Sequence, residues 1–361
     1  MISDDEMLKD ALKQYAEATC NLLAEKLFED ESPMDLLSSL MVTISFGDIG
    51  ESQRNLINRL PEADGFLNAI KKHPVAGQHI DVLVGTNRGA HRVTPFTVMY
   101  QFMESLIIRQ NGIAFNTKAF DAIFSEMMEF FESEYIPVQV VAPLENFKLD
   151  TDVVHLPNEW RIARIPDDIR DDWFRRHKYA FDDSIYMWAE FSLLKDYSSR
   201  KIIIGKGAHR EMDHAEIDHI DVEIDTIVRS LIILKSGGVS QRIKESRVLG
   251  WNVGGPKGYS SDPFVPQIGS GPIYKLTKKE VKDLSGIIEA LLHGNSDRAF
   301  HVAIRRLYFS HVRSDIQPED KILDCLIGLE SLLLDPSSEL GYRLSIRAAL
   351  LLGDSMEERR R

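Results

Sequence analysis

Residues 320–335 restrict the fold of this chain more than any other segment, because they place a carboxylate within a run of leucines. Aliphatic residues recur there at the three- and four-residue spacing of a helix, and Glu330 falls on the same face. An ionised carboxylate buried without a partner costs roughly several kcal/mol. The sequence therefore predicts that Glu330 is buried and that a cation or hydrogen-bond network meets it. The apolar stripe consists of Leu323, Leu326, Ile327, Leu333 and Leu334.

A second helix is predicted over residues 339–353, after a short polar break and up to a glycine stop at Gly353. Arg347 borders its apolar stripe, so Arg347 is the expected partner of Glu330. Two interpretations remain open: the pair fixes how two helices pack, or it braces an active site. The stripe consists of Leu340, Leu344, Ala348 and Leu351, with Arg343 on the same edge as Arg347.

These two helices resemble the ApeA-like branch of the HEPN domains. The shared pattern is a leucine-rich helix with acidic residues, a short polar break, and a Leu-x-x-Arg-Ala-Ala-x-Leu-Leu-Gly helix. Residues 303–313 resemble the preceding helix of the same domain. The matching positions are Asp324, Leu329, Glu330, Leu332, Leu333, Leu344, Arg347, Ala348, Ala349, Leu351, Leu352 and Gly353.

The resemblance implies an RNA-directed protein of prokaryotic antiviral defence or abortive infection, with a phage-derived or ligand trigger. HEPN domains are helical bundles that often form homodimers, and many cut RNA without metal or cofactor through an Arg-x4-6-His motif. In that motif the histidine moves the proton of the ribose 2′-hydroxyl and the arginine holds the phosphate. Asp324, Glu330 and Arg347 are implied as structural support of such a site.

The chain departs from the family pattern where the motif belongs, since it ends at Arg361 in the first turn of the next predicted helix. We therefore expect a fragment of a longer endoribonuclease whose catalytic residues lie beyond Arg361, or a protein without this chemistry. Inside the chain the motif spacing recurs in Arg170 to His177 and in Arg305 or Arg306 to His311. The second pair lies in the HEPN-like region but on the wrong helix for the family, so it is a fallback only.

Composition limits the remaining possibilities. With 361 residues, 43% of them hydrophobic, the chain is long enough for two or three packed domains. A net charge of −13 argues against a broad basic surface for nucleic acid but permits a local one. An acidic N-terminus and the lack of a long apolar run predict a cytoplasmic protein without a signal peptide or membrane span. Cys20 and Cys325 are expected to be reduced.

Apolar periodicity predicts an α+β protein in four regions. Residues 1–135 are mostly helical, and 136–240 form a mixed domain with strands near 137–142, 153–156, 160–165, 186–195 and 201–204. Residues 241–274 are predicted to be a loop or linker, with an exposed glycine-rich loop over 250–266. Residues 275–361 form the HEPN-like helical domain, incomplete at its C-terminal end.

Two other clusters were weighed against simpler explanations. Trp173, Arg175 and Arg176 combine aromatic and basic side chains, as single-stranded RNA sites do, although an amphipathic surface helix is the favoured explanation. His209, His214 and His219 lie five apart, a spacing that does not converge on a metal, so no metal site is predicted.

Two functions remain from the sequence. The first is an RNase of host defence, or the sensor-containing remainder of one. The second is a non-enzymatic regulatory protein whose HEPN-like helices bind RNA or form a dimer.

Overall fold

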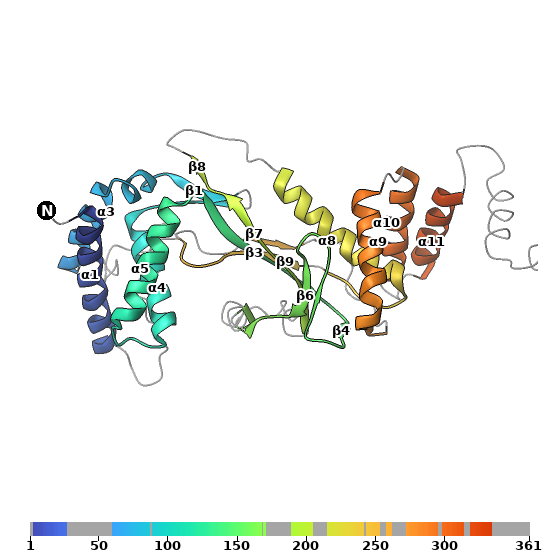
Figure 1. Ribbon diagram of the computed structural model, residues 1–361, viewed down its shortest axis with the longest axis horizontal. Helices are drawn as coiled ribbons and strands as arrows, with labels where there is room; N and C mark the ends of the chain where they lie inside the picture. Colours follow the sequence, from blue (N-terminus) through green and yellow to red (C-terminus); the bar gives the residue numbers. More distant parts are fainter. Residues whose placement is uncertain are drawn as a thin grey trace, which may run out of the picture. The chain divides into compact units, whose positions relative to one another are not determined.

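The computed structural model contains both helices and sheets, which confirms the mixed α+β class (Figure 1). Two compact units are formed. The first unit comprises Met1–Gln139, Tyr197–His214 and Ser246–Gly258, and the second comprises Val140–Asp196, Ala215–Glu245 and Tyr259–Arg361. The structure describes residues 3–26, 60–86, 89–167, 169–170, 189–204, 215–241, 243–252, 258–261, 272–294, 298–313 and 318–333.

Helices that share one apolar core make up most of the described first unit (Figure 1). They are α1 (Asp4–Lys26), α3 (Pro61–Lys72), α4 (Pro95–Gln110) and α5 (Thr117–Glu132), with the short 3-10 helix η4 (Ala76–His79). Apolar side chains at helical spacing face inward, as the sequence predicts. The largest fully buried ones are Leu8, Leu12, Tyr15, Leu23, Phe66, Phe102, Phe120 and Phe131.

Polar side chains fix where α4 and α5 begin and end. Thr94 and Thr97 form a capping box before α4, in which each hydroxyl accepts from the backbone N–H of the other residue at 3.1 and 2.8 Å. Asn116 caps α5 by accepting from the Ala119 N–H at 3.1 Å. α4 ends at Asn111, whose φ of 51° lies in the left-handed region that asparagine tolerates.

Lys201 caps the C-terminal end of α5. Its Nζ donates to the carbonyl oxygens of Phe130 and Phe131 at 2.7 and 2.9 Å, and it lies 5.5 Å from the centroid of the Phe130 ring. Carbonyls of a last helical turn carry partial negative charge, so a cation is favoured there. Burial disfavours the charged form, however, and lowers the pKa of Lys201 to about 8.

Trp251 packs against the same end of α5. Its ring centroid lies 5.5 Å from that of Phe130 and 5.7 Å from that of Phe131, and the side chain is only 3% exposed. The prediction of an exposed loop over 250–266 is therefore wrong at this residue. The glycines around Trp251 have no periodic pattern, whereas the aromatic end of α5 offers an apolar surface that the local sequence does not reveal.

Strands form three sheets among the described residues. The three-stranded antiparallel sheet has the order β2-β1-β8, and β4 and β11 form a parallel pair. A six-stranded sheet has the order β10-β9-β3-β7-β6-β5. The strands are β1 (Leu83–Thr86), β2 (Gly89–Arg92), β3 (Tyr135–Leu144), β4 (Phe147–Leu149), β5 (Val153–His155), β6 (Arg161–Arg164), β7 (Phe191–Arg200), β8 (Ile202–Ile204), β9 (Ile243–Val248), β10 (Gly258–Ser261) and β11 (Tyr274–Leu276).

Strands β3, β5, β6 and β8 lie where β-branched residues predict them, and β7 begins later than the predicted strand over 186–195. The loop or linker predicted over 241–274 is wrong in part, because β9 and β10 lie in it. β9 was not predicted from apolar periodicity because the middle of the strand is polar. Glu245 and Ser246 are buried, and Arg247 Nε donates to Gln139 Oε1 at 2.9 Å. Polar side chains that find partners inside a sheet give no alternating apolar signal.

A buried carboxylate connects the sheet of the second unit to helix α8 (Ala215–Leu234). Glu223 of α8 is 1% exposed and accepts from Trp160 Nε1 and Asn158 Nδ2, both at 2.8 Å, and from Lys195 Nζ at 2.6 Å. Asn158 and Glu159 both have positive φ, which makes the tight turn between β5 and β6 that brings Asn158 and Trp160 to this carboxylate. Burial alone would raise the pKa of Glu223, but the three donors hold it below its usual value.

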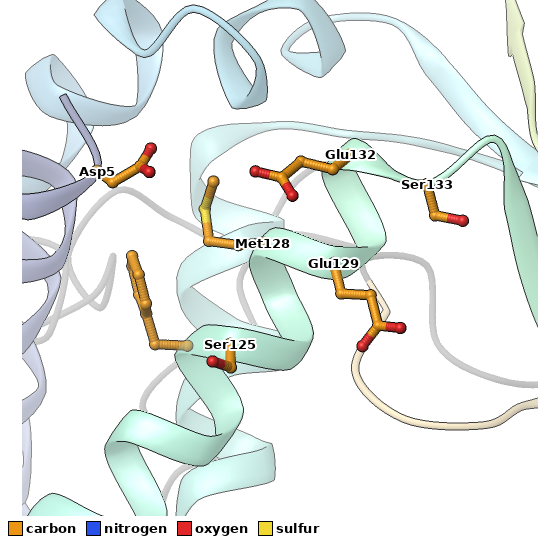
Figure 2. Close-up of a pocket in the computed structure, with 7 residues that line it drawn as sticks. Asp5, Ser125, Met128, Glu129, Glu132 and Ser133 are labelled. Atoms are coloured by element: carbon orange, nitrogen blue, oxygen red, sulfur yellow. The ribbon is translucent and has the colours of Figure 1, made fainter.

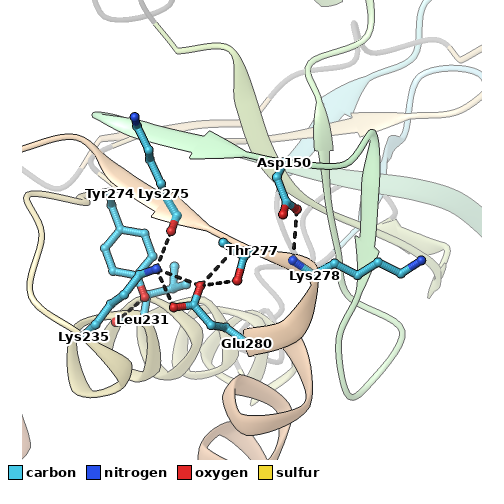
Figure 3. Close-up of polar contacts among 8 residues, drawn as sticks. All are labelled: Asp150, Leu231, Lys235, Tyr274, Lys275, Thr277, Lys278 and Glu280. Atoms are coloured by element: carbon cyan, nitrogen blue, oxygen red, sulfur yellow. Dashed lines mark hydrogen bonds and ion pairs between the residues drawn. The ribbon is translucent and has the colours of Figure 1, made fainter.

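The end of α8 is tied to the start of α9 (Val281–His293) by a second polar cluster (Figure 3). Lys235 Nζ lies 2.7 Å from both carboxylate oxygens of Glu280, which in turn accepts from the backbone N–H and the hydroxyl of Thr277 at 2.8 Å. Glu280 ends the 3-10 turn η5 (Lys278–Glu280) that leads into α9. Tyr274 OH donates to the Leu231 carbonyl at 2.7 Å. Strand β11 and helix α9 are thus both attached to α8.

The Lys201 cap predicts a specific dependence of stability on pH. The ordinary lysine pKa is 10.5 and the folded value is about 8, so the unfolded chain binds more protons between these two values and stability rises with pH there. Lys201→Met does not titrate. The free energy of unfolding of the wild type minus that of Lys201→Met should therefore increase by roughly 1–3 kcal/mol from pH 8 to pH 10.5.

Urea unfolding at several pH values across this window measures the difference. Lys118→Met, at an exposed position of α5, is the matched control for replacing a lysine with methionine. A difference that stays constant with pH for Lys201→Met would show that Lys201 is not desolvated in the folded protein.

Candidate functional site: the α10–α11 helix pair

Helices α10 (Arg298–Val312) and α11 (Pro318–Leu333) pack against each other around a buried aspartate. Asp324 of α11 is 1% exposed. Its Oδ1 accepts from Arg306 Nη1 at 2.7 Å, and its Oδ2 accepts from Arg313 Nε. Gly328, one turn later, is also buried and faces Ala303 and Arg306 of α10. One carboxylate therefore holds Arg306 of the neighbouring helix and Arg313, which directly follows that helix.

The charge balance of this cluster explains why Asp324 stays ionised. Burial alone would raise its pKa, but the hydrogen bonds from Arg313 and Arg306 outweigh that effect and hold the pKa below its usual value. Asp320 Oδ2 also lies 3.5 Å from Arg313 Nη1, so two carboxylates face the two guanidinium groups. The arginine side chains are 37% and 30% exposed and reach the surface.

Glu330 does not lie where the sequence predicts. It is exposed, as are Leu323, Leu326 and Leu329 of its predicted stripe and helix, so the prediction of a buried Glu330 among leucines is wrong. The principle behind it holds for Asp324, which is buried and paired with arginines. Because α10 presents arginines, α11 turns its aspartate and glycine towards α10 and leaves its leucines outside.

Several residues singled out in the sequence lie outside the described residues. Arg347, the expected partner of Glu330, is one of them, and the aromatic-basic cluster of Trp173, Arg175 and Arg176 also lies outside. His209 and His214 are outside as well, whereas His219 is on α8.

Arg306 and His311 do not converge. Residues five apart on a helix point about 140° apart. Arg306 is engaged by Asp324, and His311 Nδ1 lies 2.9 Å from the Leu307 carbonyl of its own helix. This geometry holds the two side chains on different sides of α10, so they do not form an acid–base and phosphate-binding pair within one chain.

A row of cationic and aromatic side chains along α10 was missed in the sequence. Arg305 is exposed and its Cζ lies 5.4 Å from the centroid of the Phe309 ring, while Arg313 Cζ lies 6.0 Å from the same centroid. His301 is exposed one turn before Arg305. The four-residue spacing of these residues in the sequence is the signal that identifies one helix face. We call His301, Arg305, Phe309 and Arg313 the α10 row.

A cavity of about 490 Å³ lies in the first unit, between the start of α1 and one side of α5 (Figure 2). Asp5, Met128 and Glu132 border it, and Phe124 adds apolar surface. Asp5 is engaged by His73, whose Nε2 lies 2.8 Å from Asp5 Oδ1. The lining is acidic and apolar, which does not suit an anionic ligand such as RNA.

Removing the carboxylate of Asp324 should destabilise the helix pair strongly. Asp324→Asn leaves two partly buried arginines without their anion, so we expect a loss of about 3 kcal/mol in the free energy of unfolding at pH 7. Because the folded pKa is depressed, this contribution is present above the unfolded pKa of about 3.9 and is lost as the pH falls through the folded value. Urea unfolding at neutral and acidic pH measures both effects.

Asp320→Asn is the matched control for this change. Asp320 is 43% exposed and lies 3.5 Å from Arg313, so its loss should cost less than about 1 kcal/mol. Equal effects of the two substitutions would show that the buried position of Asp324 is not what stabilises the pair.

Comparison with known proteins finds no match for this chain. No protein-family model matches the chain, and neither a curated protein nor a solved structure matches it. In the described residues no helix is long and apolar enough to cross a membrane, and no three His, Cys, Asp or Glu side chains gather where they could hold a metal ion. The resemblance to HEPN domains therefore rests on the sequence pattern alone.

Proposed function

We propose that the protein is a cytoplasmic, RNA-directed protein of the HEPN type that acts in prokaryotic antiviral defence, and that the α10 row contacts the RNA. The observation that carries this proposal is the concentration of positive charge on one helix of an acidic protein. The segment from Arg298 to Arg313 contains no acidic residue, whereas the whole chain has a net charge of −13. A local cationic surface is what phosphate binding requires.

The chemistry of the α10 row suits single-stranded RNA. Arginine forms paired hydrogen bonds with phosphate oxygens and stacks on bases, and an adjacent aromatic ring supplies a second flat surface. Arg305 is exposed and lies over Phe309, so its guanidinium is already oriented by the ring. Asp324 orients Arg313 in the same way, through a carboxylate.

The geometry supports RNA binding better than RNA cleavage by the described residues. Cleavage without metal needs an arginine and a histidine that reach the same phosphodiester, and Arg306 and His311 do not converge. An endoribonuclease reaction therefore requires an Arg-x4-6-His pair elsewhere. A homodimer and a phage-derived or ligand trigger stay predictions from the resemblance.

Charge reversal in the α10 row tests RNA binding. Arg305→Glu should weaken binding of a single-stranded RNA oligonucleotide by about tenfold or more at moderate salt, since it removes one phosphate contact and adds repulsion. Fluorescence anisotropy measures this. Lys118→Glu, the same charge change at an exposed position of α5, is the matched control and should have little effect. Equal weakening by both variants would mean that only net charge matters.

Cleavage is tested with the same RNA in the presence of a chelator, with new ends examined for a 2′,3′-cyclic phosphate. We expect binding without cleavage by this chain. Cleavage that is abolished by His311→Ala would contradict that expectation and would make Arg306 and His311 the catalytic pair, supplied by two copies of the chain.

A further inference from the structure

The two arginines of the α10 row differ in how their guanidinium groups are held. Arg313 Nε donates to Asp324 Oδ2, and Arg313 Nη1 lies 3.5 Å from Asp320 Oδ2. Arg305 is exposed, lies over the Phe309 ring and makes no ion pair among the described residues. The row therefore has one arginine whose charge is open to an anion and one whose charge two carboxylates already face.

The two carboxylates hold Arg313 in different ways. Asp324 is 1% exposed and also binds Arg306, so displacing it would leave two arginines without their buried anion. Asp320 is 43% exposed, and its 3.5 Å distance from Arg313 is longer than an ordinary hydrogen bond. Exposed ion pairs of this kind contribute little free energy. Asp324 is therefore the fixed partner of Arg313, and Asp320 is the exchangeable one.

The position of Asp320 in its helix favours such an exchange. Asp320 lies in the first turn of α11, where the partial positive charge of the helix N-terminus stabilises a carboxylate. The side chain therefore keeps a favourable electrostatic environment when it loses Arg313. A phosphate suits the exchange, because a guanidinium binds phosphate and carboxylate oxygens with the same planar set of donors.

We infer that Asp320 is an acidic gate on the α10 row, which occupies Arg313 until an RNA phosphate displaces it. This inference rests on the proposed RNA binding and concerns its regulation. While Asp320 occupies Arg313, a phosphate meets the open charge of Arg305 alone. Arg305 and Arg313 lie 5.4 and 6.0 Å from the centroid of the same Phe309 ring, so one short RNA segment can reach both. The gate therefore favours a strand that follows α10 over a single phosphate contact.

A double-mutant cycle measured by fluorescence anisotropy with a single-stranded RNA oligonucleotide tests the gate. Asp320→Asn should tighten binding about three- to tenfold at low salt, because it removes a like charge that opposes the phosphate at Arg313. In an Arg313→Gln background the same substitution should change the affinity less than about twofold, since the gate has no group to act on. Glu319→Gln, the same charge change at the neighbouring exposed position, is the matched control and should change the affinity less than about twofold.

The salt dependence of binding gives a second readout that needs Asp320→Asn alone. A displaced Asp320 takes up a counterion in the wild type, which offsets part of the counterion release from RNA. The slope of log K against log salt should therefore be shallower for the wild type than for Asp320→Asn, by about 0.5 to 1. A purely structural role of Asp320 would leave this slope unchanged.

Three outcomes would overturn the gate while leaving RNA binding intact. They are equal affinities and salt slopes for the wild type and Asp320→Asn, an equal gain from Glu319→Gln, and a gain that persists in full in the Arg313→Gln background. The RNA-binding proposal fails separately, and the gate with it, when the wild type binds no RNA or when Arg305→Glu leaves the affinity unchanged.

Discussion

The second unit depends on the carboxylate of Glu223. This side chain is almost completely buried, and it receives hydrogen bonds from the β5–β6 turn, from Trp160 beside β6 and from Lys195 of β7. A buried anion of this kind is tolerated only when its donors surround it, and removing one donor leaves a costly unpaired group. Helix α8 is therefore held in one position on the sheet. Since α9 and α10 both pack against α8, the position of the C-terminal helices within this unit follows from that contact.

Asp324 is a second buried carboxylate that joins a helix to its neighbour through hydrogen bonds, and it lies later in the chain. Glu223 attaches α8 to a sheet, and Asp324 attaches α11 to α10 through Arg306 and Arg313. On α8 the carboxylate lies on a face that also buries Ile224, Ile227 and Leu231, whereas on α11 the residues buried against α10 are Asp324 and Gly328. The consequence at α11 is that most of its leucines are exposed, because a helix has only one orientation that satisfies its buried charge.

Sequence patterns predicted the elements whose signals are local. Strands β3, β5 and β6 follow from β-branched residues. Thr94 and Asn116, which bind backbone groups within one turn at the starts of α4 and α5, are local signals of the same kind that the sequence analysis did not use. Elements whose partners are distant in the chain were missed. β9 is polar and finds its partners across the sheet, and Trp251 is buried by aromatic residues more than a hundred positions earlier. For α11 the pattern suggested the leucines as the buried face, because the arginines of α10 that bind Asp324 cannot be read from α11 itself.

The acidic character of the chain makes the proposed RNA contact selective rather than general. At long distance a polyanion such as RNA experiences the net charge of −13 as a whole and is repelled by it. Only close approach to the exposed part of α10 around Arg305 changes the sign of the interaction, because residues 298–313 contain no carboxylate and the carboxylates of α11 pair with Arg306 and Arg313. Salt screens the long-range repulsion more than the close contacts, since charges separated by more than about 10 Å are largely screened at 0.1 M ionic strength. An RNA that binds this surface must therefore approach a small cationic region against the repulsive electrostatic field of the acidic chain. Its shape and its stacking on Phe309 would then contribute more to recognition than charge alone.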